Sequence, residues 1–210
     1  MAISTYTELK ASIADFLNRD DITSVIPDFI SLSEAQMERE LRHWRGQKKA
    51  SISIGARYVP VPADLVQLLR LHLDDGYSTK LSLITMDEML EYRMNTGDAV
   101  GKPRYYCITA DNIEVFPTPD ITYTAEILYY ETLDKLSDST SSNWVLSYHP
   151  DAYLYGALLQ SAPYLKDDVR INVWSVLYAG AVGSINNDSN KARSGGSGLR
   201  LRINSYRSRR

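Results

Sequence analysis

Three histidines are the side chains in this sequence best suited to metal binding or acid–base catalysis. His43, His72 and His149 lie far apart, and none has a neighbouring set of ligands at the spacing of a metal site. The local patterns place His43 at a helix end, His72 in a strand and His149 before a helix. We therefore interpret all three as structural residues and predict no metal site.

Acidic residues and a single cysteine offer few further possibilities for chemistry. Asp74-Asp75-Gly76 resembles the start of a calcium loop, but no series of acidic ligands follows, which favours a type I′ hairpin turn. Asp167 and Asp168 are typical of a helix's first turn, where the macrodipole favours carboxylates. Cys107 lies in a strand-like run, as expected for a small buried hydrophobe. The sequence has no GxGxxG, Walker or GxSxG motif, so we predict no catalytic centre, no cofactor and no enzymatic activity.

Charge is distributed very unevenly along the chain. Residues 189–210 contain seven Lys and Arg and no carboxylate, which gives a formal charge of +7. Without those seven, 16 of the 23 basic residues remain against 26 Asp and Glu, so residues 1–188 carry −10. A strongly basic end on an acidic body indicates an appendage that binds elsewhere.

The basic end also has an internal pattern. Gly195, Gly196 and Gly198 form a flexible tether, and the segment after it, residues 199–203, alternates apolar and cationic side chains. That alternation is typical of a strand, yet the tail supplies no second strand to pair with it. The docking residues we predict are Leu199, Arg200, Leu201, Arg202, Ile203, Tyr206, Arg207, Arg209 and Arg210.

Helical and strand patterns alternate along the acidic body. Thr5-Tyr6-Thr7-Glu8 is a capping box that begins a helix reaching about Asn18, and a second helix runs from near Pro27 to Gly46. From Lys48 to about Glu131 the apolar period becomes two, which predicts strands. Within this stretch a second capping box, Thr85-Met86-Asp87-Glu88, predicts one short helix. Helical patterning returns over residues 150–164 and 167–187.

These elements predict an α+β fold. The helices from the two ends of the body would form a four-helix bundle, with a central β-rich insertion and an extended C-terminal tail. We divide the chain into an N-terminal helical hairpin (1–47), the insertion with one short helix (48–142), a C-terminal helical hairpin (143–188) and the basic tail (189–210). Small residues on the last helix, Ala179, Gly180, Ala181 and Gly183, would permit close packing or a crowded interface.

Membrane and export signals are not visible in the sequence. The N-terminal residues lack the basic and apolar parts of a signal peptide. Residues 171–187 are uncharged, but the run is short and interrupted by Asn and Ser, so we expect no membrane span. The 15 tyrosines could line a wet sheet face or take part in protein interfaces, where tyrosine is enriched.

Several segments, taken in order, resemble the head-to-tail adaptor proteins of tailed bacteriophages. They are the N-terminal STYTELK segment, Ile26-Pro27-Asp28-Phe29-Ile30 with the following residues 33–42, Val61-Pro62-Ala63-Asp64-Leu65, Trp144 followed by residues 149–157, and residues 162–168 with the basic Gly/Ser-rich end. The resemblance implies a homo-oligomeric ring of twelve copies in the virion neck, made in the host cytoplasm. It also implies that the C-terminal segment inserts into the portal protein and that a tail nozzle or tail tube protein binds below.

Two functions from different classes remain open at this point. As a connector, the ring would pass double-stranded DNA through its lumen without specific binding, which an acidic body would favour. The alternative is a nucleic-acid-binding module whose basic tail neutralises phosphates. The alternation over residues 199–203 favours the connector, because an electrostatic tail needs no apolar register.

Overall fold

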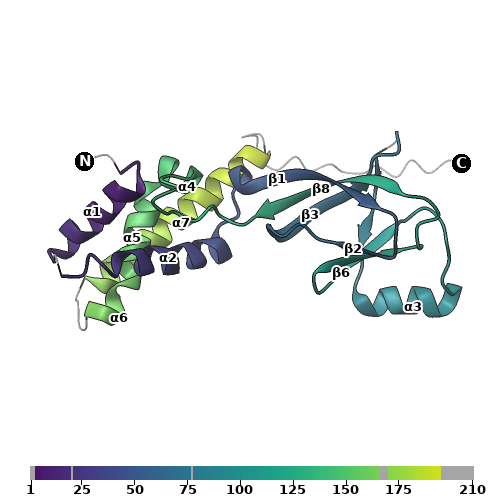
Figure 1. Cartoon of the computed structure of the whole chain (residues 1–210), viewed down its shortest axis with the longest axis horizontal. Helices are drawn as coiled ribbons and strands as arrows, with labels where there is room; N and C mark the ends of the chain where they lie inside the picture. Colours follow the sequence, from purple (N-terminus) through teal and green to yellow (C-terminus); the bar gives the residue numbers. More distant parts are fainter. Residues whose placement is uncertain (1–2, 20, 77, 166–169, 195–210) are drawn as a thin grey trace, which may run out of the picture. The chain divides into compact units, whose positions relative to one another are not determined.

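A computed structural model describes residues 3–19, 21–76, 78–165 and 170–194, and it divides the chain into two compact units. We call residues 1–45 with 133–210 the helical unit, and residues 46–132 the β unit. Figure 1 shows the elements of each unit. No helix in the described part of the chain combines the length and apolar character needed to cross a membrane.

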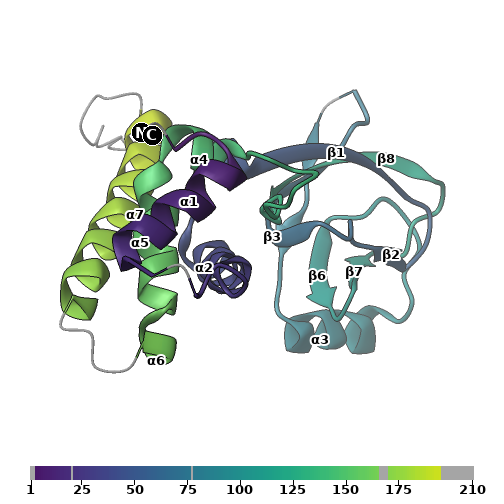
Figure 2. The same ribbon diagram turned by 60° about the vertical axis from the view of Figure 1, so that its left-hand side comes forward.

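The helical unit is organised around one buried helix. Its elements are α1 (Tyr6–Leu17), α2 (Ile26–Glu40), α4 (Trp144–Tyr148), α5 (Pro150–Gln160), α6 (Ala162–Leu165) and α7 (Ile171–Ser194). A short 3-10 helix, η1 (Trp44–Gly46), follows α2. Helix α5 contacts α1, α2, α4, α6 and α7, and Figure 2 shows α5 among the longer helices. The described parts of five helices thus pack against α5.

Local capping explains where several of these helices begin and end. The Thr5 side chain accepts from the Glu8 N–H while Glu8 accepts from the Thr5 N–H, so the first predicted capping box is confirmed. Helix α1 ends at Asn18, which adopts the left-handed conformation. Asn143 begins α4 by accepting from the Leu146 N–H at 3.0 Å.

A buried polar network attaches the loop after the β unit to the helical core. The Glu34 carboxylate accepts from the Leu136 N–H at 2.8 Å and from the Tyr153 hydroxyl at 3.1 Å. Asn143 donates to the same hydroxyl at 2.6 Å and to the Asp134 carbonyl oxygen at 2.7 Å. Burial raises the pKa of the Glu34 carboxyl. Because each of these groups has a hydrogen-bond partner, the network fixes the loop without leaving a buried polar group unsatisfied.

Gly156 of α5 allows three helices to approach one another closely. An added Cβ would lie 2.2 Å from Ser33 Oγ on α2 and 3.1 Å from the Tyr178 ring on α7.

We expect Gly156→Ala to lower the free energy of unfolding by about 1–3 kcal/mol, because these side chains must shift. Gly180→Ala is the matched control, since nothing lies within 4 Å of its added Cβ. Alanine there should raise stability by about 0.5–1 kcal/mol through helix propensity. Urea unfolding followed by circular dichroism checks both, and equal effects would contradict the packing argument.

The described residues of the β unit form two four-stranded sheets. The first has the strand order β1-β8-β3-β4, formed by β1 (Gln47–Ile54), β8 (Tyr123–Glu131), β3 (Leu65–Leu73) and β4 (Thr79–Lys80), all antiparallel. The second has the order β2-β7-β6-β5, formed by β2 (Tyr58–Pro60), β7 (Asn112–Phe116), β6 (Tyr105–Thr109) and β5 (Ser82–Leu83), with β5 parallel to β6. Side chains from both sheets, among them Leu71, Ile113 and Ile127, form one apolar core.

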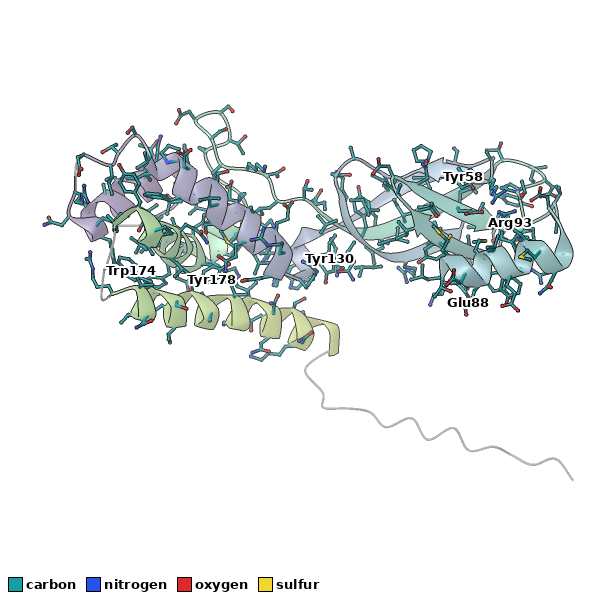
Figure 3. All side chains as sticks on the ribbon, turned by 90° about the horizontal axis from the view of Figure 1, so that it is seen from below. Tyr58, Glu88, Arg93, Tyr130, Trp174 and Tyr178 are labelled. Atoms are coloured by element: carbon teal, nitrogen blue, oxygen red, sulfur yellow. The ribbon has the colours of Figure 1, made fainter. Side chains whose placement is uncertain are left out.

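Helix α3 (Met86–Thr96) packs on β6 in this unit. Its capping box is confirmed: the Glu88 N–H donates to Thr85 Oγ1 at 3.2 Å and the Thr85 N–H to the Glu88 carboxylate at 2.8 Å. Gly97 ends the helix with φ +67°. Arg93 leaves the buried side of α3 and reaches Glu114 on β7, a contact to which we return below (Figure 3).

The predicted four-helix bundle is wrong. The described residues contain seven α-helices and two four-stranded sheets, so the fold is α+β with a large share of sheet. One helix was predicted over residues 150–164, whereas residues 144–165 form three short helices, because Asn143 caps α4 and Ser161 separates α5 from α6. Pro60 ends strand β2, which lies at an edge of the second sheet, a position that proline tolerates.

The turn prediction at Asp74-Asp75-Gly76 needs correction as well. Strands β3 and β4 pair from Leu73 to Thr79, so their connection is longer than a two-residue type I′ turn. The Asp75 carboxylate accepts from the Thr79 hydroxyl at 3.0 Å and forms an ion pair with Lys102. These contacts stabilise the longer loop.

Candidate interaction surfaces

The predicted docking segment lies outside the described residues. This holds for Gly195, Gly196 and Gly198 of the tether and for Leu199, Arg200, Leu201, Arg202, Ile203, Tyr206, Arg207, Arg209 and Arg210. Asp167 and Asp168 also lie outside them. The described chain leads to the tether through α7, whose last residue is Ser194.

The structure brings together two of the three histidines. His43 and His149 are 106 positions apart in the sequence. In the helical unit their ring centroids are 6.1 Å apart. His72 lies in the β unit, with Nε2 3.8 Å from a Glu126 oxygen. No group of three or more His, Cys, Asp or Glu side chains in the described ranges is arranged to hold a metal ion. We therefore describe the contact between His43 and His149 as part of an aromatic cluster and not as a metal site.

Four further residues, from η1 and α4, complete this cluster. The His43 ring stacks on Trp144 with a centroid distance of 5.1 Å and contacts Trp44 at 5.3 Å. The Arg45 guanidinium lies over the Trp44 ring at 4.5 Å and over the Tyr148 ring at 3.9 Å. His43 is buried, whereas Trp44 and Tyr148 are 43% and 57% exposed. The cluster thus has a buried base and an exposed edge of Trp, Arg and Tyr, residue types that dominate binding energy at interfaces.

Burial lowers the pKa of His43, and electrostatic interactions with His149 and with the Arg45 guanidinium lower it further, while Asp188 acts in the opposite direction. Because the unfolded chain then binds a proton more readily than the folded one, stability should fall as the pH drops below about 6.5, the unfolded value. We expect His43→Phe, which keeps an aromatic ring against Trp144, to flatten this dependence. Urea unfolding at a series of pH values measures it, and an unchanged slope in the variant would refute the assignment to His43.

A second exposed surface follows one side of α7. Trp174 and Tyr178 project toward the other helices of the unit, as Figure 3 shows, and Val182 and Ile185 are buried with them. The opposite side is exposed at Val173 (57%), Val176 (71%) and Leu177 (40%), and it continues through Gly180 and Gly183. Residues 171–187 contain no charged side chain. An exposed, uncharged helix face of this length is typical of a protein contact surface.

A groove of about 440 Å³ borders this helix face. Its walls come from Gln36 and Glu40 of α2, Leu159 of α5, and α7, including Ala179 and Gly183. Asn186 joins two of these walls, because its side chain accepts from the Arg42 N–H at 2.8 Å and donates to the Glu40 carbonyl oxygen at 3.1 Å. The groove is lined by apolar side chains such as Leu159 and Val182 and by the amides of Gln36 and Asn186, which already form hydrogen bonds.

The β unit carries a third exposed apolar surface on α3. Met86, Leu90 and Met94 follow one another at four-residue spacing and are 52%, 58% and 78% exposed. Asp87 and Glu91 are exposed on the same helix. This combination of flexible apolar and acidic side chains suits an adaptable protein contact.

Cys107 and the tyrosines can now be placed. Cys107 is buried, which confirms the prediction of a small apolar role, and burial raises the pKa of its thiol. Tyr106, Tyr129, Tyr130, Tyr153 and Tyr178 belong to the core, whereas Tyr58, Tyr92, Tyr148 and Tyr164 are exposed. Of the exposed ones, Tyr148 is the member of the aromatic cluster that sequence reasoning missed.

Comparisons with known proteins were made for the whole sequence. Residues 4–202 match the family model described as SU10 adaptor protein. The search of curated proteins gave no match. The matched range includes both units and extends into the predicted docking segment.

Proposed function

The chain belongs to the SU10 adaptor protein family, and on this premise we propose that it is a structural protein of the phage virion that forms a ring of twelve copies beneath the portal. The ring would link capsid to tail in the virion neck, with a tail nozzle or tail tube protein below it. The observation that carries this proposal is the family match over residues 4–202, which spans nearly all of the chain. A structural adaptor has no need of a catalytic centre.

The basic tail is the proposed portal anchor. Leu199, Leu201 and Ile203 would occupy apolar pockets, and Arg200 and Arg202 would pair with portal carboxylates. A segment of alternating pattern can also add as a strand to a sheet edge, where main-chain hydrogen bonds provide affinity. Helix α7 supports this role, because it runs directly into the Gly195, Gly196 and Gly198 tether and so gives the tail a firm base.

The exposed face of α7 is the proposed contact with a neighbouring copy in the ring. Val173, Val176 and Leu177 provide apolar area, and Gly180 and Gly183 leave room for a close approach, since nothing lies within 4 Å of either position. Head-to-tail contacts between identical subunits close into a ring when the rotation permits, and a symmetric portal can template that closure. Repetition around the ring would compensate for weak individual contacts.

DNA is proposed as cargo that passes without specific binding. The acidic body, with −10 over residues 1–188, repels phosphates, whereas a basic channel wall would retain them. The competing nucleic-acid-binding module would need the tail's seven cations for phosphate contacts.

Electron microscopy of the chain mixed with its portal protein tests the proposal. The expected image is a twelve-fold ring of additional density on one end of the portal, with a strand entering the portal from each subunit. Portal alone is the control for the density, and the chain with a DNA duplex is the control for the alternative. A portal that stays undecorated while the duplex is bound would favour the nucleic-acid module.

A further inference from the structure

We propose that Arg45, held between the exposed rings of Trp44 and Tyr148, is a docking point for a carboxylate side chain of a second copy of this chain. The inference concerns a surface distinct from the tail and from the exposed face of α7. It rests on the ring of the proposed function, and its test needs no portal protein.

Contacts with buried residues fix the position of Arg45. Its backbone N–H donates to Nδ1 of His43 at 3.3 Å, and the buried His43 ring stacks on Trp144. The guanidinium carbon lies 4.5 Å from the Trp44 ring centroid and 3.9 Å from that of Tyr148. Both contacts restrict the rotamers of a long side chain, so less conformational entropy is lost when a ligand binds.

Stacking leaves the binding edges of the guanidinium available. Arg45 is exposed, and a guanidinium that stacks on aromatic rings keeps its in-plane N–H groups available as a forked donor for a carboxylate. Among the described residues no carboxylate forms an ion pair with Arg45, whereas Arg19 pairs with Asp21 and Arg57 with Glu114. Trp44 and Tyr148, each about half exposed, would shield an incoming ion pair from water.

A carboxylate fits this site better than a nucleic-acid phosphate. Phosphate backbones are bound by several cations in sequence, but the nearby Arg42 guanidinium donates to the carbonyl oxygens of Glu38 and Leu41. The lowered pKa of His43 keeps its ring neutral near pH 7. The guanidinium also covers the ring faces on which bases would stack.

A second copy is the partner whose chemistry matches best. The body of each copy has an excess of ten carboxylates over cations. Exposed acidic side chains such as Asp28 and Asp87 have no ion pair among the described contacts. Adjacent acidic subunits in a ring would repel one another, and a shielded Arg–carboxylate pair at their contact would offset that repulsion and fix the register.

Sedimentation velocity of the full chain over a range of concentrations tests the proposal. Wild type should self-associate, and Arg45→Ala should weaken the association at least about tenfold. Arg45→Lys should weaken it nearly as much, because lysine keeps the charge but loses the fork and the ring stacking. Arg39→Ala, at an exposed arginine of α2 outside the cluster, should behave as wild type.

Four results would overturn the proposal. The first three are a wild-type chain that stays monomeric at every concentration, an Arg45→Lys variant that associates as wild type does, and a loss of association in Arg39→Ala equal to that in Arg45→Ala. A fourth is binding of a DNA duplex that Arg45→Ala abolishes while self-association is unchanged, which would assign the cluster to nucleic acid. Unfolding curves equal to wild type confirm that each variant is folded. Failure of portal binding would contradict the proposed function but not this pairing.

Discussion

Deletion of residues 198–210 is expected to abolish incorporation of the chain into portal complexes while leaving a folded subunit. The apolar cores of the two units contain no residue from this segment in the described part of the chain, so the truncated chain keeps both cores. Binding should fall by at least about 100-fold, because loss of each tail is multiplied through the avidity of a ring. Cosedimentation of the chain with portal rings measures incorporation, and circular dichroism confirms the fold.

A composition-matched variant separates the two interpretations of the tail. Exchanging Leu201 and Arg202, as Leu201→Arg with Arg202→Leu, keeps the charge of +7 but destroys the apolar–cationic alternation. We expect this variant to lose portal binding as the deletion does, since its apolar side chains no longer share one face. An electrostatic tail would tolerate the exchange and would bind a DNA duplex with a steep dependence on salt. Full portal binding by either variant would contradict the anchor proposal.

The elements that sequence predicted well are those with local signals. Both capping boxes begin helices where expected, because each is complete within four residues. Elements that depend on partners far away in the sequence were harder to predict. Strand β2 is three residues long and is stabilised by pairing with β7, more than fifty positions away, which no local pattern reveals. Helix α5 is central because its surroundings come from both ends of the chain.

The same distinction applies to the candidate surfaces. The family resemblance is confirmed by the match over residues 4–202. It was based on several segments that occur in a particular order along the sequence, and not on one motif. The stacking of Arg45 on Tyr148 joins residues on either side of the β unit, so spacing in the sequence could not indicate it. The small residues of α7 were visible in sequence, but only the structure separates buried Ala181 from exposed Gly180 and Gly183. The tail's role stays a prediction.

Glu114→Ala is expected to be the most destabilising single substitution in the β unit, at about 3–5 kcal/mol. The Glu114 carboxylate is buried on β7 and accepts from Arg57 Nε at 2.8 Å and from Arg93 Nε at 2.9 Å. Arg93 is itself buried and donates to the Val115 carbonyl oxygen at 2.9 Å. Removal of the anion would leave two guanidinium groups facing each other, one of them without access to water.

Glu126→Ala is the matched control, on strand β8 of the other sheet. Glu126 pairs with Lys49 at 3.4 Å, but its side chain is 37% exposed, so water screens the pair and its loss should cost about 0–1 kcal/mol. Urea unfolding of the full chain compares the two variants. Similar costs would show that the Glu114 network is no stronger than a surface pair.

The Glu114 network also determines how firmly α3 is attached. Only Met89 and Arg93 of this helix are buried in the described β unit, so Arg93 supplies a large part of its attachment. In Glu114→Ala we therefore expect hydrogen exchange to accelerate first in α3, before the central strands β3 and β8. Since α3 presents Met86, Leu90 and Met94, the same variant should weaken any partner that binds this face without altering the helical unit. Uniform acceleration across both units would instead mean that they unfold together, and the attachment argument would fail.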